Sequence, residues 1–246
     1  MIERILVIGV SGRVAEATAR LYAERGAQLF LIAPDAGRVE AIAADLRVRG
    51  AQTALAAGVD LGEPERLAQI VTEADAALGG IDLAVLAIDA PPEPEGEQDT
   101  AASIRTVFET GCLGPLGVLT RLAALLERRG QGRLAVLSSV AGERGRRQDF
   151  AHGAAAAAVN VFLQGLRGRL AGAGVQVLTV KLGGPARDPA SGALPRLLEV
   201  SPRKAARRIV QAADRRREVI YVPATWGAIT WLLHLLPEKL LKRLPY

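Results

Sequence analysis

The sequence has little cysteine, few aromatic residues and no long apolar run. Cys112 is the only cysteine, so no intramolecular disulfide can form and nothing predicts an oxidising compartment. Aromatic residues make up 4% of the chain, which is too few to predict base stacking along a nucleic-acid groove. No uncharged apolar run reaches the roughly 18 residues that a membrane-spanning helix requires. We therefore expect a cytoplasmic protein that neither crosses a bilayer nor binds nucleic acid.

The chain does have enough apolar sequence to bury one large core. Half of its 246 residues are hydrophobic, which fits a single α/β domain. Its net charge of +5 comes from 31 basic residues against 26 acidic ones, and the arginines occur in most segments. This distribution favours a solvated, arginine-rich surface over a nucleic-acid groove.

Short β-type runs alternate with longer helical patterns from end to end, which predicts parallel strands joined by crossover helices. The resulting fold class is α/β, with a single Rossmann-type, doubly wound, seven-stranded parallel sheet followed by an amphipathic helical tail. A surface loop is expected at 91–98, with a helix beginning near Asp99 or Thr100. The seven expected strands are Ile5–Ile8, Gln28–Ile32, Gln52–Ala57, Leu83–Ile88, Leu134–Leu137, Val175–Lys181 and Val219–Val222.

The C-terminal segment differs in composition from the rest of the chain. We divide the sequence into a domain at 1–223 and a tail at 224–246, because the tail combines two tryptophans and many leucines with lysine and arginine near its end. This composition is typical of a helix that lies in a membrane interface. The same residues also suit a helix that covers the core or a dimer interface, so peripheral contact with the inner face of the membrane is one of two interpretations.

The order of elements and the run Ser138-Ser-Val-Ala-Gly142 after the fifth strand resemble the short-chain dehydrogenase/reductase family over nearly the whole chain. Within that family, the runs at 165–170 and 177–181 and the tail are similar to reductases of lipid-linked or sugar ketones, including decaprenylphosphoryl 2-keto-ribose reductases. The resemblance implies an NAD(P) cofactor and a ketone substrate.

The glycine-rich turn expected by this resemblance is altered. It reads Gly9-Val-Ser-Gly-Arg-Val-Ala15, so the first glycine is retained while Arg13 and Ala15 replace the other two. Gly12, displaced by one position, offers partial compensation, and Arg13 either crowds the phosphate site or pairs with a phosphate. We predict no cofactor or weak NAD(P) binding, with the remaining contacts made by Gly9, Ser11, Gly12, Arg13, Val14 and Asp60.

Other positions that meet the cofactor in the family are also changed. Asp60 matches the acid that bonds the adenine amino group, and Asp35 is interpreted either as a ribose ligand or as a helix N-cap. Ala33-Pro-Asp35 carries no arginine for a 2′-phosphate. The Asn-Ala-Gly segment reads Ile88-Asp-Ala90, and Arg187 replaces the threonine near the nicotinamide carboxamide.

Three of the four catalytic positions implied by the family differ here. Ser139 matches the serine, whereas His152 occupies the tyrosine position, Ala156 the lysine position and Gly111 the asparagine position. The tyrosines are distant in sequence and Lys181 is not expected to replace the lost lysine. Ser139 and His152 are the candidate catalytic residues, and an imidazole can act as a general acid or base. The competing interpretation is that His152 only fills the space left by the family's tyrosine. We predict no metal site.

We expect a pseudoenzyme that serves as a noncatalytic partner or scaffold for an active enzyme. The family usually pairs through its fourth and fifth helices, here 99–127 and 149–171, which predicts a homodimer, a homotetramer or a hetero-oligomer with an active family member. One alternative is a divergent NAD(P)-dependent oxidoreductase. Another is a non-redox catalyst in which His152 and Ser139 transfer a proton.

Overall fold

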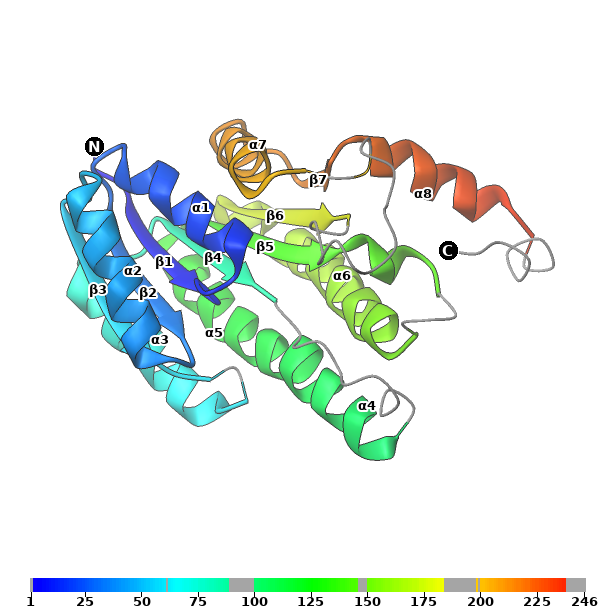
Figure 1. Ribbon diagram of the computed structural model, residues 1–246, viewed down its shortest axis with the longest axis horizontal. Coiled ribbons are helices and arrows are strands. Elements are labelled where there is room, and N and C mark those ends of the chain that lie inside the picture. Colours follow the sequence, from blue (N-terminus) through cyan, green and yellow to red (C-terminus); the bar gives the residue numbers. More distant parts are fainter. Residues whose placement is uncertain are drawn as a thin grey trace.

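The computed structural model describes residues 2–60, 62–88, 100–145, 150–183, 198 and 200–237. A single parallel sheet runs through them in the strand order β3-β2-β1-β4-β5-β6-β7, which confirms the predicted doubly wound α/β fold (Figure 1). The predicted loop at 91–98 lies outside the described residues. The strands are β1 (Arg4–Ile8), β2 (Gln28–Ala33), β3 (Thr53–Gly58), β4 (Leu83–Ala87), β5 (Gly132–Ser139), β6 (Val175–Leu182) and β7 (Val219–Val222).

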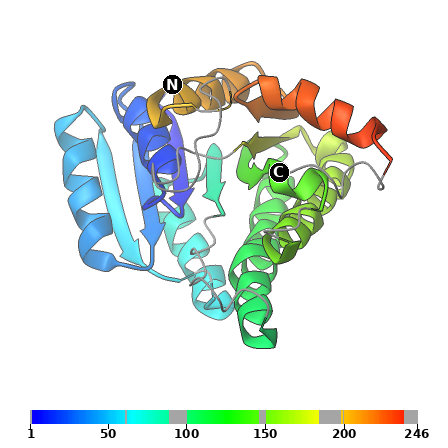
Figure 2. The same ribbon diagram turned by 45° about the vertical axis from the view of Figure 1, so that its right-hand side comes forward.

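Helices cover both faces of this sheet (Figure 2). Helices α1, α2 and α7 pack with one set of alternating strand residues, and α3, α5 and α6 pack with the other. The strands read as nearly continuous apolar runs because both of their faces are buried. The α-helices are α1 (Arg13–Ala23), α2 (Ala36–Val48), α3 (Pro64–Leu78), α4 (Ala101–Phe108), α5 (Gly114–Arg129), α6 (Phe150–Leu170), α7 (Pro202–Asp214) and α8 (Thr225–Leu235).

Strand β5 is longer than its apolar run predicted. It includes Ser138 and Ser139 because its pairing with β6 continues past the apolar residues, with Ser138 opposite Lys181 and Ser139 opposite Leu182. The next strand repeats this register, since Lys181 lies opposite Tyr221. In a parallel sheet, side chains at paired positions point to the same face. Three polar side chains from three strands therefore meet on one side of the sheet.

A short helical turn, η2 (Val140–Glu143), follows β5 directly and packs against α6. The approach is close, because a Cβ at Gly142 would lie 2.6 Å from the backbone carbon of Ala156. Helix α4 continues into the π-helical turn η1 (Glu109–Leu113) and then into α5. Thr100 caps α4, with its hydroxyl accepting the Ser103 N–H at 3.1 Å, which places the helix start within one residue of the predicted one.

Helix α8 forms the described part of the predicted tail and packs against β7 and η2. Trp226 and Thr230 are buried on its inner side, while Trp231, Leu232 and Leu235 are exposed. A Cβ at Gly183 would overlap the Trp226 indole, so the absence of a side chain there makes room for the helix. Within the described ranges, no helix has the length and apolarity needed to span a membrane.

Candidate functional site

The candidate site lies where the parallel strands end, because ligands of doubly wound sheets bind beyond the carboxyl ends of the strands. One end of this edge is formed by the turn after β1 and by the starts of α1 and α2. The other end is formed by β5, η2, α6, β6, β7 and α8. The arginines of the first end are exposed, whereas the lysine and the glutamate of the second are paired within the protein.

The turn after β1 has a glycine where only glycine fits. Gly9 adopts φ 77°, a conformation that side chains rarely tolerate, and a Cβ there would overlap the carbonyl oxygen of Ala87 on β4. The Gly9 N–H donates to Ile32 O at 2.8 Å, and Gly12 N–H donates to Gly9 O at 3.1 Å. This tight turn aims the N-terminus of α1 at the carboxyl edge of the sheet, as the retained glycine predicted.

The N-terminus of α1 is open to an anion. The backbone N–H groups in the first turn of an α-helix have no acceptor within the helix. Here the N-cap is Gly12, which has no side chain to accept from them. Arg13 is exposed, whereas Val14 and Ala15 are buried beneath it. The replacement at position 13 therefore places a guanidinium at the mouth of the turn without filling the turn itself. A pyrophosphate fits the donor groups that this arrangement presents.

A second arginine, which the sequence analysis overlooked, lies beside the same turn. The Asp35 carboxylate accepts the Arg38 N–H at 3.0 Å, so Asp35 is the N-cap of α2, one of its two predicted roles. Arg38 Nη2 donates to the carbonyl oxygen of Ser11 at 3.0 Å. An arginine guanidinium therefore lies beside the turn after β1, although Ala33-Pro-Asp35 carries none.

Asp60 lies just after β3 and organises its own loop. Its Oδ1 accepts the Gly62 N–H at 2.8 Å. This bond engages only one of the two carboxylate oxygens and so does not conflict with the predicted role. The contact with an adenine amino group stays a prediction.

At the other end of the edge, the two predicted catalytic residues lie on different elements, Ser139 on β5 and His152 on α6. Ser139 Oγ accepts the Ala141 N–H at 3.1 Å and caps η2. His152 is half-buried on α6, and no hydrogen bond joins it to Ser139 in the described part of the chain. Ala156 is buried under η2, and Gly111 lies in η1, where its missing Cβ would be 3.7 Å from that of Ala155. Ser139 and His152 therefore lie on adjoining elements, with no hydrogen bond between them in the described residues.

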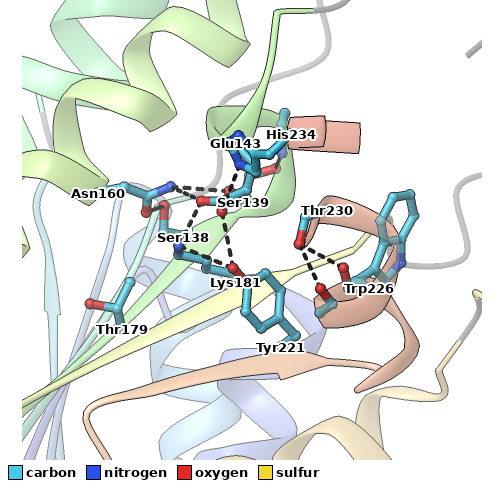
Figure 3. A network of polar contacts seen from close by, with 12 residues as sticks. Ser138, Ser139, Glu143, Asn160, Thr179, Lys181, Tyr221, Trp226, Thr230 and His234 are labelled. Carbon is cyan, nitrogen blue, oxygen red and sulfur yellow. Dashed lines mark hydrogen bonds and ion pairs between the residues drawn. The ribbon is translucent and has the colours of Figure 1, made fainter. Parts of the chain in front are cut away.

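A buried ion pair that the sequence analysis did not predict lies next to Ser139 (Figure 3). Lys181 Nζ is 2.6 Å from Glu143 Oε1, and the two side chains are only 10% and 12% exposed. Asn160 on α6 extends the cluster, with its Nδ2 at 3.5 Å from the same Glu143 oxygen and its Oδ1 accepting the Ser138 hydroxyl at 2.8 Å. Four segments, β5, η2, α6 and β6, are thus joined by a paired charge and the neighbouring hydrogen bonds.

Tyr221 completes this cluster, although its distance in sequence had argued against any such role. Its hydroxyl donates to Glu143 Oε2 at 3.0 Å and lies 3.4 Å from Lys181 Nζ. His234 on α8 approaches the same carboxylate oxygen at 3.8 Å. Separation in sequence does not report this proximity, because β5, β6 and β7 are adjacent in the sheet and their paired residues share a face. The prediction that Tyr221 does not replace the catalytic tyrosine stays a prediction. The signal available in the sequence was a polar residue near the end of each of three strands, namely Ser138, Lys181 and Tyr221.

Comparison with known proteins agrees with this architecture. The sequence model described as "short chain dehydrogenase" matches residues 3–189. The chain belongs to the short-chain dehydrogenase family. Members of this family usually bind NAD(P), which accords with the open turn after β1.

Relatives extend the similarity over nearly the full length. The chain is 30% identical to an uncharacterized oxidoreductase of Mycobacterium tuberculosis over 241 residues, which are 98% of this chain and 96% of that one. It is 31% identical to an uncharacterized oxidoreductase of Streptomyces coelicolor, again over 98% of this chain and over 95% of the relative. Neither name specifies a substrate, so the relatives indicate the oxidoreductase class alone.

Two solved structures share the fold. The apo form of LigD from Sphingobium sp. superposes with a TM-score of 0.80 at 19% identity, covering 96% of this chain and 98% of that one. A short-chain dehydrogenase from Streptomyces avermitilis gives a TM-score of 0.77 at 22% identity, covering 95% and 94%. At these identities the likeness concerns the fold.

Proposed function

We propose that this short-chain dehydrogenase binds a nucleotide weakly and acts as a noncatalytic partner subunit, without the hydride transfer of its family. One observation carries the proposal. Helix α6 presents Ala156 and His152 where the family resemblance expects lysine and tyrosine, while Lys181, the nearest described lysine, is held by Glu143 at 2.6 Å. The Lys181 ammonium also lies 3.4 Å from the Tyr221 hydroxyl, which donates to the same carboxylate. In this proposal the cluster serves the fold and does not replace the family's tyrosine and lysine on α6.

The nucleotide is supported by the residues around the turn after β1. The first-turn N–H groups of α1 suit the pyrophosphate, and Arg13 and Arg38 add positive charge on either side of it. The bound cofactor would supply a hydride acceptor or donor, but the groups that hold the nicotinamide ribose and the reacting proton in the family are absent from α6. Nucleotide binding without turnover is the expected combination.

The partner role is supported by the outer face of α6. This helix carries no Asp, Glu, Lys or Arg between Phe150 and Leu166, and its exposed positions there are apolar or small apart from Gln164. Phe150 is 48% exposed and Val161 65% exposed, and Leu113 on the neighbouring η1 is 62% exposed. Surface helices of a monomer normally carry charge on their outer face. We assign this face to a subunit interface, formed with a second copy or with an active family member.

The test combines calorimetric titration with NADPH and NADH, turnover assays with a panel of ketones, and light scattering. We expect weak binding, no change in nicotinamide absorbance with any ketone, and a mass above that of one chain. Arg38→Gln should weaken NADPH binding by about tenfold, the effect of losing one charge-assisted contact, and should change NADH binding little if the guanidinium faces the 2′-phosphate.

Arg128→Gln is the matched control, since Arg128 is an exposed arginine on α5 far from the turn. Turnover of a ketone with either nucleotide would refute the noncatalytic assignment. Val161→Glu tests the interface separately, because a charge on that face should shift the mass towards that of one chain. A mass unchanged by this substitution would remove α6 as the interface.

A further inference from the structure

Helix α7 and the turn that follows it carry a dense set of exposed basic side chains. Seven are exposed, and none has an ion pair within the described residues. The acid among them is already engaged, since Asp214 lies 3.1 Å from Arg25 and 3.8 Å from Arg133. The unpaired positions are Arg203, Lys204, Arg207, Arg208, Arg215, Arg216 and Arg217.

Part of this basic surface is hollowed. A groove of about 320 Å³ lies between α7 and β7, the last strand of the sheet, and Arg208, Arg215 and Arg217 line it together with Gln211. The remaining wall includes Ala224, the residue that precedes α8. The groove thus connects the basic surface of α7 to the start of the C-terminal helix. We call the seven basic residues and this groove the arginine face.

An apolar stripe on α8 begins where the groove ends. Residues 228, 231 and 235 follow Ala224 at spacings that return to the same side of an α-helix. Trp231 is 66% exposed, Leu235 62% and the adjacent Leu232 55%. Figures 1 and 2 show α7 and α8 extending along the same side of the molecule. The groove lined by Arg208 and by Ala224 connects the two helices on this side.

Helix α8 is fixed so that this stripe faces outward. Arg144 Nη1 donates to Leu233 O at 2.8 Å and Nη2 to Leu236 O at 3.0 Å, which satisfies carbonyl groups at the end of the helix. Trp226 and Thr230 occupy its buried side. The core thus uses one side of α8 and leaves Trp231, Leu232 and Leu235 without a packing role in the described part of the chain.

We propose that the arginine face and the α8 stripe together bind an anionic lipid surface. Phosphate head groups match the unpaired guanidinium groups, and the interfacial layer of a bilayer accepts tryptophan and leucine side chains. A second copy is a poor occupant because a symmetric contact would bring the arginines of the two subunits together. This proposal is independent of nucleotide binding and of the α6 interface.

The experiment is co-sedimentation of the full chain with vesicles of phosphatidylcholine alone and of phosphatidylcholine mixed with phosphatidylglycerol. Binding should require the anionic lipid and weaken as salt is added. Each of Arg208→Gln and Arg215→Gln should lower the partition coefficient about fivefold, and Trp231→Ser should lower it further in combination with them. Val48→Ser on α2, which is 89% exposed, and Arg128→Gln on α5 control for loss of an exposed apolar group and of a charge elsewhere.

Circular dichroism of each variant confirms that it is folded, as expected for substitutions at exposed positions. Equal sedimentation with both kinds of vesicle, or loss of binding in the control variants, would overturn the proposal. Saturable binding of inorganic phosphate at the arginine face without any vesicle binding would assign it to a free anion instead. If Trp231→Ser changes the mass in light scattering and leaves sedimentation unchanged, the stripe is a protein interface and the proposal fails.

Discussion

The two ends of the carboxyl edge use their charged groups in opposite ways. Beside β1, Arg13 and Arg38 are exposed and the first turn of α1 leaves its N–H groups open. Beside β6, Lys181 is buried against Glu143, with Tyr221 on the same carboxylate. One end is therefore prepared for a charged ligand, whereas the other satisfies its charges within the protein. Under the proposed function, the end beside β1 binds the nucleotide and the end beside β6 serves the fold.

The largest expected change in stability comes from removing the buried Glu143 carboxylate. Glu143→Ala leaves the Lys181 ammonium buried without a partner, and breaking a buried pair in this way costs about 3–5 kcal/mol of the free energy of unfolding. Urea denaturation measures it. Glu73→Ala, which removes an exposed partner of Arg66 at 3.1 Å, should cost at most about 1 kcal/mol. Similar losses in the two variants would mean that the cluster at β6 is not structural.

The binding end should be sensitive to backbone geometry rather than to charge burial. Gly9→Ala places a Cβ at φ 77° against the Ala87 carbonyl, so we expect a loss of about 1–3 kcal/mol together with weaker nucleotide binding. Gly117→Ala, in open space on α5, should instead stabilise the protein by about 0.5–1 kcal/mol. Thermal unfolding with and without NADPH separates the two effects. Unchanged nucleotide affinity in Gly9→Ala would place the ligand elsewhere.

A smaller change tests whether Tyr221 serves structure or chemistry. Tyr221→Phe removes one hydrogen bond to Glu143 and should lower the free energy of unfolding by about 1 kcal/mol, leaving nucleotide binding unchanged. Tyr22→Phe offers a contrast, because its buried hydroxyl has no partner in the described residues and its removal should cost little or nothing. If Tyr221→Phe abolishes an activity of the protein while its stability is intact, Tyr221 is a proton donor and the noncatalytic assignment is wrong.

The sequence predicted the inner strands of the sheet well because burial on both faces requires a nearly continuous apolar run in each of them. It predicted β7 at its observed bounds and β5 less well, since hydropathy does not report that Ser138 and Ser139 continue the pairing with β6. The turn at Gly9 was predictable because its glycine requirement is local. The Glu143 cluster was not, because its charged groups and the Tyr221 hydroxyl come from a helical turn and two strands that only the sheet order brings together.

The pH dependence of folding provides a further distinction, at the opposite edge of the sheet, where β1 and β4 begin. Arg4 bonds the Asp82 carboxylate through Nε at 2.9 Å and through Nη2 at 2.6 Å. Burial opposes ionisation, but these bonds and the charges of Arg4 and Arg133 outweigh it and hold the pKa of Asp82 below its usual range.

A lowered pKa means that the pair stabilises the fold above the ordinary aspartate pKa, and that this contribution disappears as the pH falls through the lowered value. Because both side chains are partly exposed, at about 29% and 26%, the contribution should be at most about 1 kcal/mol. Asp82→Asn should therefore match the wild-type stability at acid pH and fall below it near neutrality. Urea denaturation across that range measures the difference, and a constant deficit at every pH would show that Asp82 contributes through packing rather than through its charge.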